Sequence, residues 1–147
     1  MATVQNLLDR KGITVWSIAP GASVESALSL MSQKDIGALL VMDAGKIVGI
    51  FSERDYVRKI ISNARISMAT PVKEFMSHPV FYVSPQQTVD DCMSLMTAKH
   101  IRHLPVMDGE KLAGLISIGD VVKQVITEKE GTIQDLENYI TGREYNL

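Results

Sequence analysis

The apolar positions of the chain change their spacing along the sequence, and each spacing predicts one element. Val15–Ile18 is a short β-branched and aromatic run that ends at a Pro-Gly turn, which predicts a strand. Behind it, Val24, Leu28 and Met31 recur at helical spacing after Ser23, whose hydroxyl can cap the first turn. A strand is therefore followed directly by an amphipathic helix.

The next segment predicts a hairpin and a second helix. Gly37–Met42 is a continuous apolar run of strand length, residues 43–46 (DAGK) have turn chemistry, and Ile47–Phe51 is a further strand. Ser52 then begins a helix whose apolar stripe comprises Tyr56, Val57, Ile60 and Ile61. The resulting unit has the order β-α-β-β-α.

The same unit occurs a second time at an offset of 65 residues, and the match from Val15 to Lys59 needs no gap. Identical pairs include Pro20/Pro85, Val24/Val89, Met31/Met96, Ile36/Ile101, Val41/Val106, Lys46/Lys111, Gly49/Gly114, Ser52/Ser117 and Asp55/Asp120. Two copies are too few for a solenoid. We therefore expect an α/β (α+β) fold in which both repeats pack around a pseudo-two-fold axis.

This register divides the chain into five segments: a flank at 1–14, repeat 1 at 15–62, a linker at 63–79, repeat 2 at 80–127, and a C-terminal helix and tail at 128–147. In repeat 2, Val80–Val83 is the first strand, and Thr88 with Asp91 forms a capping-box pattern. Pro105 cannot donate to a central ladder, so its strand should be an edge or irregular there.

Three flanking segments carry apolar stripes that could pack on the repeats or on a partner chain. The N-terminal stripe is Val4, Leu7 and Leu8; a short helix begins at Thr70-Pro71 and carries Val72, Phe75 and Met76; a last helix begins at Gly131-Thr132, carries Ile133, Leu136 and Ile140, and ends at Gly142.

Composition narrows the functional classes. Hydrophobic residues make up 46% and charged residues 22%, as in globular proteins, and the net charge of −2 argues against a nucleic-acid partner. Cys92 is the only cysteine, and the three histidines lack metal-ligand spacing, so we expect a buried thiol and no metal. No signal-peptide pattern or membrane-spanning run is present, which predicts a cytoplasmic protein.

One strand-to-helix junction in each repeat has ligand-binding chemistry. Gly49 lets the backbone approach a ligand closely, and the Asp55 carboxylate can accept hydrogen bonds from both hydroxyls of a ribose. The free N–H groups of the helix start near Ser52 favour a phosphate. Gly114, Ser117 and Asp120 repeat the pattern. The same Ser-x-x-Asp spacing is also a capping box, and one carboxylate can serve both purposes.

The sequences GIFSERD at 49–55, GLISIGD at 114–120 and IRHLPVMD at 101–108 resemble the cystathionine-β-synthase (CBS) domain. Two such domains in tandem resemble a Bateman module of the stand-alone type. The resemblance implies a homodimer that binds AMP, ADP, ATP, NAD or another adenosine derivative between its repeats. It also implies a regulatory role toward a target protein that the sequence does not identify.

The resemblance assigns roles to particular residues. Asp55 and Asp120 would bind ribose, and Ser52 and Ser117 would lie on the phosphate side. Basic residues at the position of Arg102 and His103 meet phosphates in this family, although both could equally be surface side chains. Arg54 could meet a phosphate too. Val15, Ile18, Val80 and Val83, with Ile36 and Ile101, could line an adenine slot or simply be core.

The two sites should differ, because Glu53 and Arg54 of repeat 1 are replaced by Ile118 and Gly119 in repeat 2. The favoured function is thus a nucleotide-sensing regulatory module that requires no cofactor. The alternative is an interaction module with empty clefts. An enzyme is not expected, since the sequence has no nucleophile–base pairing, no Cys–His arrangement and no P-loop.

Overall fold

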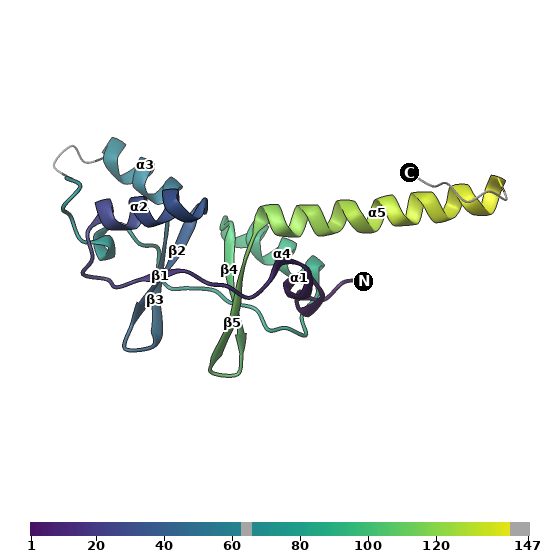
Figure 1. Cartoon of the computed structure of the whole chain (residues 1–147), viewed down its shortest axis with the longest axis horizontal. Helices are drawn as coiled ribbons and strands as arrows, with labels where there is room; N and C mark the ends of the chain where they lie inside the picture. The colour runs from purple at the N-terminus through teal and green to yellow at the C-terminus, as the bar shows by residue number, and fades with distance from the viewer. Residues whose placement is uncertain (63–65, 142–147) are drawn as a thin grey trace. The chain divides into compact units, whose positions relative to one another are not determined.

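The structure is a computed structural model that describes the backbone of residues 1–62 and 66–141 and the side chains of these ranges up to residue 131. The chain forms two compact units (Figure 1). The repeat-1 unit comprises Thr14–Phe81, and the repeat-2 unit combines Met1–Ile13 with the chain from Tyr82 onward. The N-terminal segment thus belongs with the second repeat, although it precedes the first in sequence.

The repeat-1 unit has the predicted order of elements. Its elements are β1 (Ser17–Ile18), α2 (Val24–Lys34), β2 (Ala38–Asp43), β3 (Lys46–Ser52), α3 (Glu53–Ser62) and the 3-10 helix η1 (Val72–Glu74). The sheet order is β1-β2-β3, with β1 parallel and β3 antiparallel to β2. Ser23 caps α2 by accepting a hydrogen bond from the Ser26 amide, as predicted.

The repeat-2 unit repeats this architecture. Its elements are α1 (Val4–Lys11), α4 (Val89–Lys99), β4 (His103–Asp108), β5 (Lys111–Ser117) and α5 (Ile118–Thr141). The β4–β5 hairpin matches β2–β3 in register, including an irregularity after Val106 where β2 has one after Val41. The capping box predicted for Thr88 and Asp91 is present at the start of α4. The predicted fold class, two β-α-β-β-α repeats, is therefore confirmed.

The first strand of repeat 2 is shorter than the predicted Val80–Val83. In the described residues it is reduced to a parallel bridge between Val83 and Val106. Pro105 supplies the physical reason. In repeat 1 the Leu40 N–H donates to the Trp16 carbonyl at 3.3 Å, and Pro105, at the equivalent position, has no N–H to donate.

The prediction of a separate helix beginning at Gly131-Thr132 is wrong. The structure instead has one continuous helix, α5, from Ile118 to Thr141, the yellow-green helix of Figure 1. A glycine inside a helix costs only about 1 kcal/mol relative to alanine, and no proline interrupts the segment. Gly131 therefore does not break the helix. The predicted end at Gly142 lies outside the described residues.

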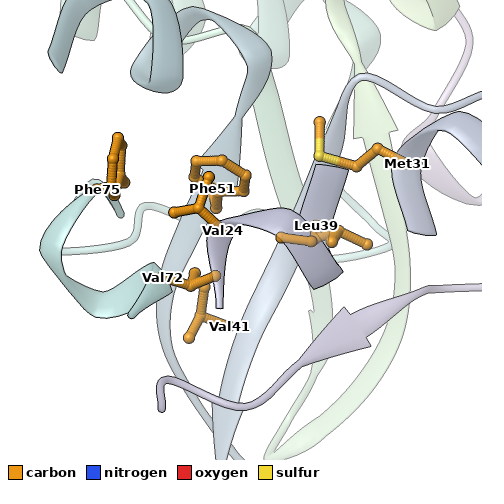
Figure 2. Close-up of a cluster of buried hydrophobic side chains, with 8 residues drawn as sticks. Val24, Met31, Leu39, Val41, Phe51, Val72 and Phe75 are labelled. Carbon is orange, nitrogen blue, oxygen red and sulfur yellow. The ribbon is translucent and has the colours of Figure 1, made fainter. Parts of the chain in front are cut away.

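The core of the repeat-1 unit forms where α2, the hairpin and η1 meet. Figure 2 shows its buried side chains: Val24, Met31, Leu39, Val41, Phe51, Val72 and Phe75. The Phe51 and Phe75 rings meet edge to face, with centroids 6.0 Å apart, and Tyr56 stacks on Phe75 at 5.8 Å. Because Phe75 follows η1, the short segment after repeat 1 completes the core of that repeat.

Each flanking segment packs on one repeat through equivalent backbone bonds. The Val4 amide of α1 donates to the Gln87 carbonyl at 2.8 Å, and the Val72 amide of η1 donates to the Ala22 carbonyl at 2.8 Å. The predicted N-terminal stripe is buried within this chain, with Val4, Leu7 and Leu8 at most 3% exposed. The segment before repeat 1 thus covers repeat 2, and the segment after repeat 1 covers repeat 1.

Candidate functional site

The Asp55 junction joins β3 to α3 and is a complete capping box. The Ser52 amide and hydroxyl both donate to Asp55 Oδ2 at 3.0 Å, and the Asp55 amide donates to Ser52 Oγ at 3.2 Å. The second carboxylate oxygen, Oδ1, accepts a 3.0 Å hydrogen bond from the Ser77 hydroxyl. Each donor described for this carboxylate is electrically neutral, so hydrogen bonds hold the carboxylate without pairing its charge.

The Asp120 junction joins β5 to α5 and has the same capping frame. The Ser117 amide donates to Asp120 Oδ2 at 2.8 Å, and the Asp120 amide donates to Ser117 Oγ at 3.2 Å. Here the additional donor is a cation. Lys11 Nζ, at the end of α1, lies 2.5 Å from Asp120 Oδ2 and donates to the Leu115 carbonyl at 2.7 Å. The capping interpretation of both Ser-x-x-Asp motifs is therefore confirmed.

The ion pair changes the acidity of Asp120. Burial raises the pKa of this carboxyl, but the hydrogen bond and charge of Lys11, together with the hydrogen bonds from Ser117, outweigh burial and hold the pKa below its ordinary value. The side chains are only partly exposed, 34% for Lys11 and 25% for Asp120. Asp120 is consequently an ionised carboxylate already paired within the chain.

The outer edges of the two hairpins explain why the donors differ. In repeat 1, Ile50 of β3 exchanges two backbone hydrogen bonds with Ser77, at 3.1 and 2.8 Å. In repeat 2, the equivalent Leu115 carbonyl accepts from Lys11 Nζ. Ser77 therefore bonds the edge of β3 through its backbone and Asp55 through its hydroxyl. In repeat 2 the Lys11 ammonium donates to both the Leu115 carbonyl and Asp120.

The paired glycines have a packing role. A Cβ at Gly49 would lie 2.5 Å from Met76 Sδ, and a Cβ at Gly114 would lie 2.7 Å from Leu8 Cδ2. Both distances are far below van der Waals contact, so the missing side chains make room for Met76 and Leu8. The flanking segments, rather than a ligand, occupy the space beside these two glycines.

The predicted basic residues lie in different surroundings. Arg102 is exposed just before β4, and its carbonyl accepts a 2.8 Å hydrogen bond from the Ile118 amide. His103 is half-buried and pairs with Ser117 across the hairpin. Arg54 is exposed in the first turn of α3. A groove of about 690 Å³ lies beside Arg102 and is lined by Arg102, Ile118, Gly119, Val122, Lys123, Ile126, Thr127 and Glu130.

The residues predicted to line an adenine slot divide by burial. Val83 is fully buried and belongs to the core, whereas Val15, Ile18 and Val80 are half-buried. Ile18 packs against the core cluster of repeat 1. Their partial exposure leaves apolar surface on Val15, Ile18 and Val80 that a planar base could cover, so the adenine assignment stays a prediction for these three.

The other reactive groups point to no further chemistry. Cys92 is buried in α4, as predicted, and burial together with the charge of Asp91 raises the pKa of its thiol to about 11. Among the described residues, no three His, Cys, Asp or Glu side chains converge as a metal site would require. Within the same part of the chain, no helix is long and apolar enough to cross a membrane.

The CBS domain family model matches residues 11–62 and 72–127, which include both hairpins and both Ser-x-x-Asp junctions. The chain belongs to the CBS-domain family. The residues outside the two matches are 1–10, 63–71 and 128–147. The chain is accordingly a CBS pair, a regulatory type of module.

Relatives of known sequence or structure support this assignment. A CBS-domain protein from Burkholderia ambifaria MC40-6, proposed to act in signal transduction, has 50% identity and a TM-score of 0.82, covering 86% of this chain and 95% of that one. The mitochondrial CBS domain-containing protein CBSX3 of Arabidopsis thaliana is 40% identical over 82% of this chain. YhcV of Bacillus subtilis (strain 168) is 30% identical over 88%. The aligned part spans 61% of CBSX3 and 92% of YhcV.

Sequence reasoning missed two residues of this CBS pair, Ser77 and Lys11. Both lie outside the gapless match at an offset of 65. The flanking segments match each other at an offset of 68 instead, which places Val4 on Val72 and Leu8 on Met76. A separate comparison of the apolar stripes of the two flanks could have found this register and drawn attention to the polar residues that follow each stripe.

Proposed function

We propose that this CBS pair binds an adenosine nucleotide, AMP, ADP, ATP or NAD, at the Asp55 junction and acts as a nucleotide-responsive regulatory module. The observation that supports this most is the Asp55 carboxylate. It stands half-buried at a strand-to-helix junction and is held by neutral donors. A charged acceptor without a described cation is suited to the two hydroxyls of a ribose.

Ribose binding at Asp55 would replace one neutral hydrogen-bond donor by another, so little hydrogen-bond energy would be lost. The Ser77 hydroxyl is the only described donor to Asp55 Oδ1, and Ser77 is exposed. A ribose hydroxyl can replace it while the Ser52 cap on Oδ2 stays in place. The N-terminus of α3 favours the phosphate, and Arg54 in its first turn adds a positive charge. In repeat 2 the phosphate candidates are Arg102 and His103, which align with Gly37 and Ala38 of repeat 1.

A thermal-shift panel tests the proposal. The panel contains AMP, ADP, ATP, NAD and S-adenosylmethionine, with GTP as the control for unspecific phosphate binding. A ligand that binds only the folded chain and is present at 100 times its Kd stabilises it by about 2.7 kcal/mol. We expect adenosine ligands to raise Tm and GTP to have no effect. Equal shifts with GTP would contradict the preference for adenosine, and no shift with any ligand would contradict nucleotide binding.

A second candidate function, association between chains, has its own observation. Large apolar side chains are exposed at equivalent positions of α3 and α5. They are Val57 (49% exposed) and Ile61 (78%) on α3, and Val122 (46%) and Ile126 (51%) on α5. Exposed apolar stripes on helices mark association surfaces. We propose that these stripes form a homodimer interface of the CBS pair.

Light scattering after gel filtration tests this association. The Ile61→Asp and Val122→Asp variants place a charge within each stripe and should convert a dimer into a monomer. Lys59→Asp, on the exposed surface of α3, is the matched control and should stay dimeric. A monomeric wild-type chain would contradict the interface. A dimer that shows no nucleotide shift would favour the interaction module with empty clefts.

A further inference from the structure

The two junctions offer a ribose different carboxylates. At Asp55 the donor to be replaced is a neutral hydroxyl on an exposed serine. At Asp120 the donor is the ammonium of Lys11, so the attraction of opposite charges adds to the hydrogen bond. A ribose hydroxyl that displaced Lys11 would exchange an ion pair for a hydrogen bond from a neutral donor, and the carboxylate would lose its cation.

Lys11 is held in position by the docking of α1. Leu8 fills the space beside Gly114, and Val4, Leu7 and Leu8 are buried. At the other end of α1, the Ala2 amide donates to Glu128 Oε1 at 2.9 Å. Arg10 bonds Gln124 at 2.9 Å. The backbone of Lys11 is therefore fixed against α5, and only its side chain would have to move.

Helix α1 ends at Lys11, and Gly12 is its C-cap. Gly12 has a φ of 99°, which favours glycine, and its amide donates to the Leu8 carbonyl at 2.7 Å. Lys11 is thus the last helical residue before the chain turns away. The ammonium also binds the Leu115 carbonyl, so its departure would remove a donor from that carbonyl and the cation from the Asp120 carboxylate.

We propose that Lys11 is an internal competitor for the Asp120 carboxylate, so that the CBS pair binds one adenosine nucleotide per chain, at the Asp55 junction. Lys11 is then the residue that determines which of the two duplicated sites is open. The lowered pKa of Asp120 agrees with a carboxylate that is already committed to a cation. This inference rests on the proposed nucleotide binding, and its test separates the two.

Isothermal titration with AMP counts the sites. We expect one site per chain in the wild type and two in Lys11→Met, which keeps most of the length of the side chain and removes the charge. Lys123→Met is the matched control, because Lys123 lines the same recess of about 170 Å³ beside Asp120 and has no described bond to the carboxylate. This control should bind one AMP. Two wild-type sites, or one site in a folded Lys11→Met chain, would overturn the inference.

A second variant tests the inference even if Lys11→Met folds poorly. Asp55→Asn retains Lys11, so the Asp120 junction stays closed and AMP affinity should fall at least tenfold. Binding that persists in Asp55→Asn would show that the second junction is open, which overturns the competitor role. Absence of AMP binding in every variant and in the wild type would instead reject the proposed function itself, and the inference with it.

Discussion

Repeat 1 and repeat 2 share a register of 65 residues, yet they satisfy the same two acceptors with different chemistry. In repeat 1, Ser77 bonds the edge of β3 through its backbone and Asp55 through its hydroxyl. In repeat 2, the Lys11 ammonium bonds both the edge carbonyl of Leu115 and Asp120. Both repeats thus keep the same Ser-x-x-Asp capping box. The flanking segments differ in the donor that they bring to its carboxylate, a neutral hydroxyl in repeat 1 and a cation in repeat 2.

The flanking segments also differ in how tightly they fill the space beside Gly49 and Gly114. Substitution of these glycines should give the largest change in stability. Gly114→Ala would drive a Cβ into Leu8, which is 2% exposed, whereas Gly49→Ala would meet Met76, which is flexible and half-buried. Overpacking of a core costs about 1–3 kcal/mol. We expect the loss of unfolding free energy to lie at the upper end of this range for Gly114→Ala and at the lower end for Gly49→Ala.

Urea denaturation of both variants measures this comparison. Gly45→Ala is not a suitable control, because its φ of 78° would strain any side chain. Gly21→Ala is suitable, since nothing lies within 4 Å of the added Cβ. If both glycine variants were as stable as Gly21→Ala, the close packing of the flanking segments on the hairpins would be refuted.

The Lys11–Asp120 ion pair should contribute a smaller, pH-dependent stabilisation. A partly exposed ion pair is worth up to about 1 kcal/mol, so Lys11→Met should lose no more than this at pH 7. The folded pKa of Asp120 is depressed, so its contribution is complete above the ordinary aspartate pKa of about 3.9 and is lost as the pH falls through the folded value.

Urea midpoints of the wild type and Lys11→Met, measured from pH 7 downward, check this prediction. The difference between the two proteins should be constant from pH 7 to about pH 5 and should shrink below about pH 4. Lys123→Met serves again as the charge control. A difference that grew on acidification would have the wrong sign for a depressed carboxyl pKa.

Ser77→Ala should have the smallest effect on stability. It removes one hydrogen bond from a neutral hydroxyl to the Asp55 carboxylate and leaves the two backbone bonds to Ile50. Because Ser77 is exposed and water can replace its hydroxyl, the loss is about 0.5–1 kcal/mol. Because Asp55 Oδ1 then loses its internal donor, AMP should bind the variant as tightly as the wild type or up to about fivefold more tightly, as 1 kcal/mol allows. A titration with AMP measures the change, and a large loss of affinity would mean that Ser77 itself holds the ligand.

The repeated architecture could be predicted from the sequence because its signals are local. The hairpins, the caps at Ser23 and Thr88, and the Ser-x-x-Asp junctions all depend on residues within a few positions of one another. The hydrogen bond that the first strand of repeat 2 lacks also follows from a local feature, the missing N–H of Pro105. These features need no knowledge of which segments meet in space.

The side chains that the flanking segments bring to Asp55 and Asp120 could not be predicted in the same way. Lys11 meets Asp120 across 109 residues, and no local pattern indicates that α1 covers repeat 2 rather than the repeat that follows it. The burial of Leu8 against Gly114 carries Lys11 to that position. The prediction of a helix start at Gly131 fails for the opposite reason, because the continuing helix on either side outweighs the local signal of one glycine.

The most direct test of the account maps AMP on the wild-type chain by amide chemical shifts. The account predicts large shifts at saturating AMP for the Ser52 and Asp55 amides, which belong to the open junction, and small shifts for the equivalent Ser117 and Asp120 amides. Equal shifts at both junctions, shifts only at Ser117 and Asp120, or no shifts at either would contradict it.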